Sequence, residues 1–476
     1  MKKIKLFFVD CSQDKRQEHP QHFFSPLEIG YCSSLLKSSD CEVSFVDTRI
    51  DPYSSDDISK KIIKENPDII LFKPSVGSRE FVLKLSECLQ GQQRKLIFCY
   101  GPTATIWPDM FLFRNSPVSG CLIEEIEETV PDLVKLIGEG KSYNGLRGVA
   151  EFDATNNCVV INKRELMTDL DSLPLPSHEL FLNKNYFFGY PLKIFKKARV
   201  AYVLSSRGCP EKCNFCSTLR RNSYGKHFRA RSEASVALEL EKIIQLGFNS
   251  VYFMDDNFCY DKERVRKICA EIISRGINKR IKWVVQCSVK SLNDEVIELM
   301  RKAGCSTVCL GIESASKKIL NNLEKDMEIQ RALEIINSLK RKGILIVAYF
   351  IIGNPKETSL EVLESLEFCK DICPDMLQLH YFSAYPDSRF IRAGDSAKLT
   401  TPYEFDPQSN FSNMSGETLS RLYVHFYRSY YFNLATITNF FRKQLVTYII
   451  NWEQKVFFCM KGLKYMLGRS HKKEIC

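Results

Sequence analysis

Residues 199–216 read RVAYVLSSRGCPEKCNFC, a strand-like run that leads into Cys209, Cys213 and Cys216. The spacing C-x3-C-x2-C puts three thiols on one tight loop at the carboxyl end of the predicted strand. Three thiolates that face a common point can bind an iron–sulfur cluster, and the next cysteine, Cys259, is far along the chain. One iron would then keep an open position. The spacing leaves two alternatives, a zinc ion with an open position and a chance group of buried thiols.

Strands and helices alternate from the cysteine loop toward residue 390. The predicted strands are 199–205, 250–255, 282–288, 307–310, 344–352 and 376–382. Amphipathic stretches such as 233–246 and 328–342 separate them and are typical of helices. Six such units predict a curved parallel sheet, a partial (β/α)6 barrel over residues 198–390, whose working end is formed by the carboxyl ends of the strands.

A second alternation fills residues 1–140. Its predicted strands are 5–10, 42–47, 69–73, 95–100 and 120–123, and its predicted helices are 27–37, 57–65, 81–90 and 126–138. Short links of this kind predict an α/β domain with a Rossmann-like, doubly wound parallel sheet, which binds ligands beyond the carboxyl ends of its strands. Residues 141–197, with two prolines in LPLP at 173–176, are predicted to be an irregular linker. Residues 391–476 are predicted to form a helical region.

The cysteine motif, with Phe215 before its last cysteine, resembles the signature of the radical S-adenosylmethionine (SAM) enzymes. Later strand ends match that family in order: MDDNF at 254–258, GIES at 311–314 and FIIGNPKET at 350–358. The resemblance implies a [4Fe–4S] cluster on Cys209, Cys213 and Cys216, with SAM chelating the open iron. Reductive cleavage of SAM would give a 5′-deoxyadenosyl radical, which abstracts hydrogen from an unactivated carbon.

The same resemblance assigns a set of residues at the strand ends to SAM. These residues are Phe215, Asp255, Asp256, Glu313 and Gly353. Phe215 would lie near the adenine, while Glu313 and the Gly353 turn would hold ribose, methionine or adenine groups. Capping of a following helix is the alternative role for the three acidic residues.

A Rossmann-like sheet ahead of a radical SAM domain resembles the cobalamin-binding members of the family. The landmarks of that group are NPDII at 66–70, YGPTAT at 100–105, EEIEET at 124–129 and DSLPLP at 171–176. The resemblance implies that cobalamin lies against the loops that follow the third and fourth strands. The residues assigned to it are Ser75, Gly77, Gly101, Pro102, Thr103 and Thr105. Tyr100, Thr103 and Glu124 depart from the usual residues, and a purely structural sheet is the alternative.

Two absent motifs bear on this domain. No histidine lies in an Asp-x-His-x-x-Gly motif, so no such histidine would ligate cobalt from below. By resemblance, a weakly ligated cobalt fits methyl transfer to a carbon radical. A G-x-G-x-x-G fingerprint follows none of the N-terminal strands, which argues against a dehydrogenase.

The chain has 476 residues, 19 cysteines and a formal net charge of +10. The odd number of cysteines, without a secretory signal, argues against a disulfide framework. No apolar run is long enough to span a bilayer, so we expect a cytoplasmic protein. Two further pairs repeat the C-x3-C spacing and are predicted to be small core residues. These pairs are Cys305 with Cys309 and Cys369 with Cys373.

Most of the net positive charge of the chain lies in residues 415–476, which are also rich in aromatic residues. Aromatic residues at helical spacing favour packing against the barrel. A basic amphipathic helix also favours peripheral contact with a membrane, which leaves membrane association open. Nucleic-acid binding is the weakest of the three interpretations, and we expect no nucleic-acid partner.

Together these features predict a radical SAM enzyme with a [4Fe–4S] cluster and cobalamin that methylates an unactivated carbon of a small-molecule or lipid-like substrate. An external electron donor of the flavodoxin or ferredoxin type would reduce the cluster. One alternative is a cobalamin-dependent cyclase or rearrangement enzyme, as in oxidative ring closure of a porphyrin ester. The contrasting class is a non-catalytic iron–sulfur protein. No sequence feature assigns a catalytic residue beyond the cofactor sites.

Overall fold

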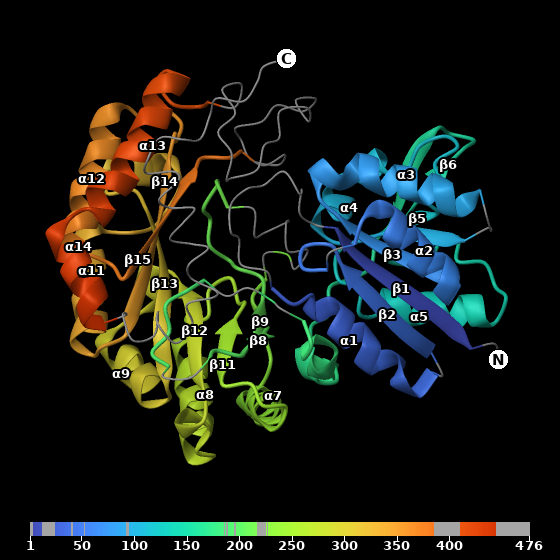
Figure 1. Cartoon of the computed structure of the whole chain (residues 1–476), viewed down its shortest axis with the longest axis horizontal. Helices are drawn as coiled ribbons and strands as arrows, with labels where there is room; N and C mark the ends of the chain where they lie inside the picture. The colour runs from blue at the N-terminus through green and yellow to red at the C-terminus, as the bar shows by residue number, and fades with distance from the viewer. Residues whose placement is uncertain are drawn as a thin grey trace.

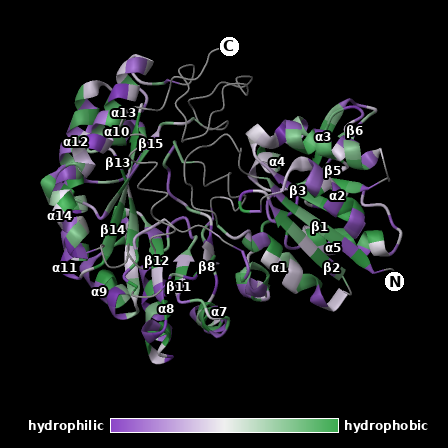
Figure 2. Cartoon of the chain, in the orientation of Figure 1, coloured by the Kyte–Doolittle hydropathy of each residue, from purple (hydrophilic) through white to green (hydrophobic). Residues whose placement is uncertain are grey.

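Two large, mainly parallel sheets with flanking helices lie side by side in the computed structural model (Figure 1). The structure describes residues 3–11, 24–39, 41–51, 53–91, 95–184, 186, 189–194, 197–216, 225, 227–384 and 410–443. The strands of both sheets are mostly hydrophobic, whereas the helices carry hydrophilic residues (Figure 2). The predicted α/β fold, with a doubly wound sheet followed by a partial barrel and a helical region, is confirmed.

The N-terminal sheet has the order β2-β1-β3-β4-β5-β6-β7. Its parallel strands are β1 (Ile4–Cys11), β2 (Cys41–Asp47), β3 (Ile69–Pro74), β4 (Leu96–Cys99) and β5 (Gly120–Leu122). The helices are α1 (Leu27–Leu36), α2 (Ser55–Glu65), α3 (Arg79–Gln90), α4 (Pro102–Ile106) and α5 (Thr129–Gly138). Successive residues of a strand point to opposite faces, so Phe7 and Phe8 enter two separate hydrophobic clusters. The sheet is therefore buried on both faces, as a doubly wound fold requires.

A hairpin extends this sheet beyond its predicted end. Strands β6 (Val149–Asp153) and β7 (Cys158–Asn162) pair antiparallel, and β6 pairs with β5. The prediction of an irregular linker from residue 141 is wrong for this hairpin. Two apolar runs flank a turn in which the Asp153 carboxylate accepts the Thr155 and Asn156 N–H groups and Asn157 has φ +52°. Beyond the hairpin the linker forms only 3₁₀ turns, Leu170–Ser172 and His178–Phe181, among the described residues.

The second sheet holds the six predicted parallel strands in the order β15-β14-β13-β12-β11-β8. They are β8 (Val200–Val203), β11 (Ser250–Phe253), β12 (Lys282–Cys287), β13 (Cys305–Glu313), β14 (Leu345–Ile352) and β15 (Met376–Tyr381). The helices are α7 (Glu233–Gln245), α8 (Lys262–Ser274), α9 (Asp294–Lys302), α10 (Lys317–Asn322), α11 (Ile329–Arg341) and α12 (Ser359–Ile372). A short antiparallel pair, β9 (Ser206–Arg207) with β10 (Arg229–Ala230), was not predicted. The buried positions of Cys305, Cys309 and Cys369 confirm their prediction as core residues, whereas Cys373 is only partly buried and that prediction is wrong for it.

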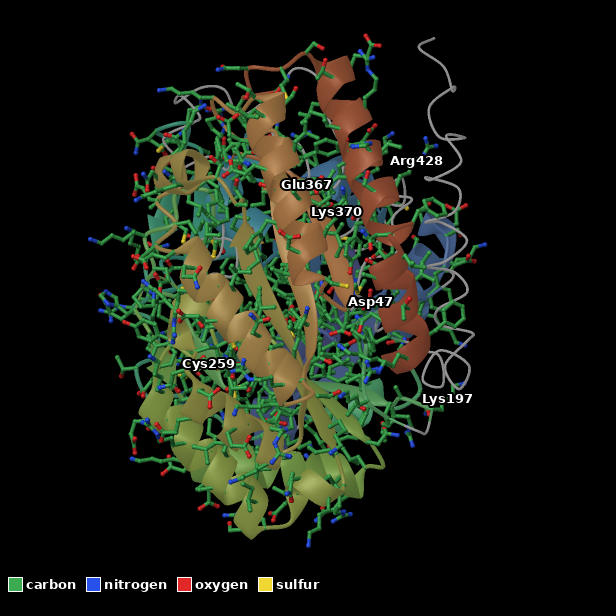
Figure 3. All side chains as sticks on the ribbon, turned by 90° about the vertical axis from the view of Figure 1, so that its left-hand side faces the viewer. Asp47, Lys197, Cys259, Glu367, Lys370 and Arg428 are labelled. Carbon is green, nitrogen blue, oxygen red and sulfur yellow. The ribbon has the colours of Figure 1, made fainter. Side chains whose placement is uncertain are left out.

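Two C-terminal helices lie on the barrel, α13 (Gly416–Tyr431) and α14 (Leu434–Lys443). Helix α13 runs beside α12 on the outer surface (Figure 3). The Tyr423 hydroxyl donates to the Leu379 carbonyl (3.3 Å), and the Phe426 ring lies 5.6 Å from that of Phe350. The aromatic residues of α13 are therefore mainly core residues. Residues 444–476 of the basic aromatic tail lie outside the described residues.

Candidate functional site

The cysteine loop begins directly after β9, at the carboxyl edge of the barrel. Two neighbouring segments anchor it. The Asn214 N–H donates to the Leu323 carbonyl (3.1 Å), just beyond α10, and Glu211 forms an ion pair with Lys290 (2.6 Å), which follows β12. The three thiols are thus held on a loop fixed to two strand–helix connections of the barrel.

The three thiols are close enough to act on one another electrostatically. Burial raises the pKa of Cys209 to about 12 and that of Cys213 to about 11, and the Cys216 thiolate adds to both shifts. The Lys325 ammonium opposes the shift at Cys213. Such thiols lose their protons when they bind metal, and a cluster of irons would supply the positive charge. The residues therefore fit a thiolate-bound cluster.

In the described part of the chain, which contains all three cysteines of the loop, no group of three or more His, Cys, Asp or Glu side chains is arranged to hold a metal ion. The choice of a cluster over a zinc ion therefore rests on the resemblance of the cysteine motif and not on the placement of the three thiols.

Glu313 is aimed at the cysteine loop by strained backbone. It ends β13 with φ +65°, a conformation that side-chain-bearing residues seldom adopt. Its carboxylate is buried and forms an ion pair with Lys325 (3.2 Å), whose ammonium also acts on Cys213. A Cβ at Gly311 would overlap the Glu313 carboxylate, so this glycine makes the room that the carboxylate occupies. Burial raises the pKa of Glu313.

Asp255 and Asp256 differ in what they contact. The buried Asp255 carboxylate accepts hydrogen bonds from the Ser205 N–H (2.8 Å), the Ser205 hydroxyl (2.6 Å) and the Ser206 hydroxyl (2.5 Å). Asp255 therefore fixes the segment that leads into the cysteine loop. The charge of Asp256 raises the pKa of Cys209, which places Asp256 beside the loop itself.

Helix capping does not explain the three acidic residues. The N-cap of α8 is Asp261, and the N-cap of α10 is Ser316. The alternative role that the sequence left open for Asp255, Asp256 and Glu313 is therefore wrong.

The turn after β14 completes this edge. Gly353 has φ +81°, and both its N–H and that of Asn354 donate to the Glu357 carboxylate (2.6 and 3.0 Å). A Cβ at Gly353 would lie 2.9 Å from Leu419 of α13, so only glycine fits without displacement. Phe215 of the cysteine loop and Ile351 near the end of β14 pack against the same hydrophobic cluster. Phe215 and Glu313 thus lie at the cysteine loop, and Gly353 lies at the carboxyl end of the neighbouring strand β14.

The loops predicted to hold cobalamin lie at the carboxyl edge of the N-terminal sheet. After β3, Ser75 and Ser78 exchange hydrogen bonds between their N–H groups and hydroxyls (2.8 and 3.1 Å), which leaves Gly77 exposed. After β4, Gly101 has φ +86° and leads into α4, with Pro102 in its first turn and Thr103 buried. The Thr105 hydroxyl accepts the Glu124 N–H (2.9 Å), which ties this loop to the one after β5.

The same edge contains buried charges that satisfy one another. Arg49 pairs with Asp47 (2.6 Å) and Asp10 (3.1 Å), and Lys73 pairs with Glu28. Because these charges are paired with one another, the surface that remains to contact a large ring consists of small residues and backbone at Gly77 and Gly101. The edge therefore fits a bulky, amide-rich cofactor such as cobalamin.

The family model of the radical SAM superfamily matches residues 203–369, which contain the cysteine loop, Glu313 and Gly353. Residues 203–369 therefore form a radical SAM domain. A radical SAM domain implies a [4Fe–4S] cluster and SAM, so the prediction of an enzyme with these two cofactors is confirmed.

Relatives of this radical SAM enzyme include an uncharacterized methyltransferase of Pyrococcus horikoshii. It is 27% identical over 417 residues, which are 85% of this chain and 87% of the relative. The anaerobic magnesium-protoporphyrin IX monomethyl ester cyclase of Cereibacter sphaeroides is 26% identical over 376 residues, 76% of this chain and 59% of the cyclase. The chain thus spans less than two thirds of the cyclase's length.

The fold is similar to a solved structure of the radical SAM methyltransferase TsrM from Kitasatospora setae with cobalamin and a [4Fe–4S] cluster bound. The TM-score is 0.65 at 14% identity, covering 81% of this chain and 74% of TsrM. The similarity confirms the expected fold, in which a sheet of the cobalamin-binding type precedes the radical SAM barrel.

Sequence reasoning missed two buried groups at the barrel edge of this radical SAM enzyme. Lys325 lies in a turn after α10 and carries no motif, so its approach to Cys213 depends on how the barrel closes. Glu357 follows Gly353 by four residues within the turn after β14, and its place in this short turn is the signal that could have found it.

Proposed function

We propose that the chain is a cobalamin-dependent radical SAM methyltransferase that methylates an unactivated carbon of a small-molecule or lipid-like substrate. The observation that carries the proposal is the joining of two carboxyl edges: the cysteine loop of the barrel connects through buried ion pairs to the loop after β5. The methyltransferase of Pyrococcus horikoshii and the fold of TsrM support it.

Different residues of the barrel have different roles at the SAM site. Cys209, Cys213 and Cys216 would hold the cluster, and the reduced cluster supplies the electron that cleaves SAM to a 5′-deoxyadenosyl radical. Glu313 can accept hydrogen bonds from an amino or hydroxyl group of SAM, and Lys325 can pair with the SAM carboxylate. The ion pair between Glu313 and Lys325 holds both side chains in place before SAM binds.

Other residues keep the SAM site dry and shaped. Phe215 belongs to a hydrophobic cluster at the ends of β14 and β15, which limits the access of water to the thiols. Gly353 allows α13 to approach the turn after β14. Asp256 adds negative charge beside Cys209, where it would oppose reduction of a bound cluster.

Cobalamin would lie at the carboxyl edge of the N-terminal sheet, against Ser75, Gly77 and the segment Gly101, Pro102, Thr103 and Thr105. When bound, cobalamin supplies the methyl group, and a second SAM molecule restores it. A small electron-transfer protein of the flavodoxin or ferredoxin type would provide the electrons.

A stripe of exposed apolar residues on and before α14 supports peripheral contact with an anionic membrane. The stripe consists of Phe432, Leu434, Ile437 and Phe441, and Arg442 follows it. Leu434 is 78% exposed, and basic residues beside apolar ones favour the interface of anionic lipids. No helix in the described part of the chain is long and apolar enough to cross a bilayer.

Flotation with vesicles of anionic phospholipid tests the membrane contact. The double variant Leu434→Ser/Phe441→Ser should leave the vesicle fraction. The control is Leu360→Ser, which removes an equally exposed leucine (73%) on α12 and should float like the wild type. Equal flotation of all three chains would defeat the membrane proposal.

The proposed reaction is tested by anaerobic reconstitution with iron, sulfide and cobalamin, followed by dithionite and SAM. We expect both 5′-deoxyadenosine and S-adenosylhomocysteine, because one SAM is cleaved and another gives up its methyl group. Release of 5′-deoxyadenosine with retained cobalamin and no S-adenosylhomocysteine would instead favour the cyclase alternative, to which the relative from Cereibacter sphaeroides points. Absence of both products would overturn the proposal.

A further inference from the structure

Four charged side chains join the barrel to the N-terminal sheet. Arg207 of β9 pairs with Glu125 (2.9 Å) and Glu127 (2.6 Å) in the loop after β5. Arg229 of β10, which is paired with β9, reaches Glu125 as well (2.9 Å). All four side chains are between 2% and 8% exposed. We call this group the interdomain clamp.

Further contacts fix the clamp on every side. The second oxygen of Glu125 accepts the Met167 N–H of the linker (2.9 Å). The Arg207 guanidinium lies over the ring of Tyr31 in α1, 5.6 Å from its centre. Because each arginine is planar and its donors point in fixed directions, the clamp permits one relative placement of the two sheets.

The clamp is linked to both predicted cofactor sites by very short lengths of chain. On the barrel side only Gly208 separates Arg207 from Cys209, and a Cβ at Gly208 would overlap the His227 carbonyl, so this link is tightly packed. On the other side, Glu124 precedes Glu125 and donates its N–H to Thr105. A shift of the clamp would therefore move the cluster ligands relative to the predicted cobalamin loop.

Buried ion pairs contribute little net stability, since the loss of hydration offsets their attraction. Their value lies in geometry, because a displaced partner leaves a buried charge unpaired. The barrel also pairs an arginine and a glutamate on its surface: Arg266 contacts Glu295 through two bonds of 2.9 Å and is one-third exposed. That pair joins two helices of the same domain and can yield without exposing a buried charge.

We propose that Arg207, Glu125, Glu127 and Arg229 are positioning residues that set the separation between the cluster on the cysteine loop and cobalamin at the edge of the N-terminal sheet. The inference rests on the proposed function for the presence of cobalamin. It goes further by assigning the acidic motif after β5 to the placement of the two cofactors relative to each other.

The test uses the full chain loaded with both cofactors. Pulsed electron paramagnetic resonance measures how strongly the reduced cluster speeds the relaxation of cob(II)alamin, which depends steeply on their separation. Arg207→Lys keeps the charge but removes the second bond of the fork. We expect it to retain iron and cobalamin while the relaxation enhancement falls by about half or more and its distribution broadens. The matched control, Arg266→Lys, should give the wild-type enhancement.

A second readout needs no cofactor. Hydrogen exchange in residues 122–127 and 203–208 should be about tenfold faster in Arg207→Lys than in the wild type and unchanged in Arg266→Lys. Glu127→Gln, which leaves Arg207 paired with Glu125, should give the same changes in smaller measure.

The outcomes separate this inference from the proposed function. If the wild-type chain retains no cobalamin, the proposed function fails, and exchange rates alone decide whether the clamp ties the sheets together. If cobalamin is retained and the relaxation enhancement in Arg207→Lys and Glu127→Gln equals that of the wild type, the proposal that the clamp sets the separation of the cofactors is overturned. Loss of a cofactor in both variants also overturns it, because positioning residues leave the ligands in place.

Discussion

At the carboxyl edge of the barrel, Glu313 and Lys325 form a largely buried ion pair that acts on Cys213, and Gly353 forms the turn at the end of the neighbouring strand β14. At the carboxyl edge of the N-terminal sheet, Arg49 neutralises Asp10 and Asp47. Both edges belong to parallel sheets, yet the barrel directs its charges at the cysteine loop. The N-terminal sheet pairs its charges among themselves or with Arg207 of the barrel.

The difference follows from what each edge must hold. A cluster and SAM are charged and reactive, so their site needs oriented charges in a dry setting. A large neutral ring needs area and small residues, and unpaired charges beneath it would be costly to bury. Strand topology therefore predicts where a ligand lies, and the pairing of charges indicates which kind of ligand it is.

The comparison predicts its largest effect at the cysteine loop. Cys213→Ala should lose the cluster and lower 5′-deoxyadenosine formation at least about 100-fold, because the electron for SAM cleavage comes from the cluster. Iron content and product are measured after anaerobic reconstitution. The control is Cys305→Ala, a buried cysteine on β13 outside the loop, which should retain its iron. Product formation by Cys213→Ala would contradict the assignment of the barrel edge.

A second substitution separates the two edges. Arg49→Met leaves Asp10 and Asp47 facing each other in a buried site, which should cost about 3–5 kcal/mol of unfolding free energy. Cobalamin retention should fall while iron content stays at the wild-type value, because the charge lost is in the N-terminal sheet. Lys325→Met should do the reverse, lowering SAM cleavage and sparing cobalamin. Loss of the same cofactor in both variants would contradict the assignment of different cofactors to the two edges.

Much of the fold could be predicted from local pattern. All six barrel strands and the five parallel strands of the first sheet appear within a few residues of their predicted bounds, because buried strands carry uninterrupted apolar runs. The β6–β7 hairpin was missed because its two apolar runs are only five residues long, and β7 is mostly exposed. The short pair β9–β10 offered too few residues for a pattern.

The candidate site could be predicted only where its residues are close in sequence. The three thiols lie on one loop, whereas Lys325 reaches Cys213 and Arg207 reaches Glu125 through the folding of distant segments. Asp255 follows β11, at the strand end where its motif lies, but its carboxylate accepts hydrogen bonds from the hydroxyls of Ser205 and Ser206, which the motif does not predict.

Glu357 predicts a pH dependence at the barrel edge. Burial raises the pKa of its carboxyl from 4.5 to about 7. The unfolded chain releases this proton first as pH rises, so Glu357 lowers the unfolding free energy between pH 4.5 and about 7, by roughly 3 kcal/mol in all. Urea unfolding across this range should show a shallower decline in Glu357→Gln than in the wild type. Glu364→Gln, on the exposed face of α12, should keep the wild-type slope.

The smallest effect concerns the contact of α13 with the turn after β14. Gly353→Ala combines an unfavourable positive φ with the approach of Leu419 and should cost about 2–3 kcal/mol. Gly276→Ala shares the positive φ but meets no atom within 4 Å, so it should cost only about 1–2 kcal/mol. Thermal or urea unfolding gives both values. Equal losses would show that α13 does not press on this turn.

Cofactor analysis after anaerobic reconstitution decides whether one chain holds a cluster at one edge and cobalamin at the other. Iron, sulfide and cobalamin are quantified in the wild type and in Cys213→Ala. We expect about four irons and one cobalamin per wild-type chain, with the iron lost and the cobalamin retained in the variant. A wild-type chain without cobalamin, or a variant that loses both cofactors together, would contradict this expectation.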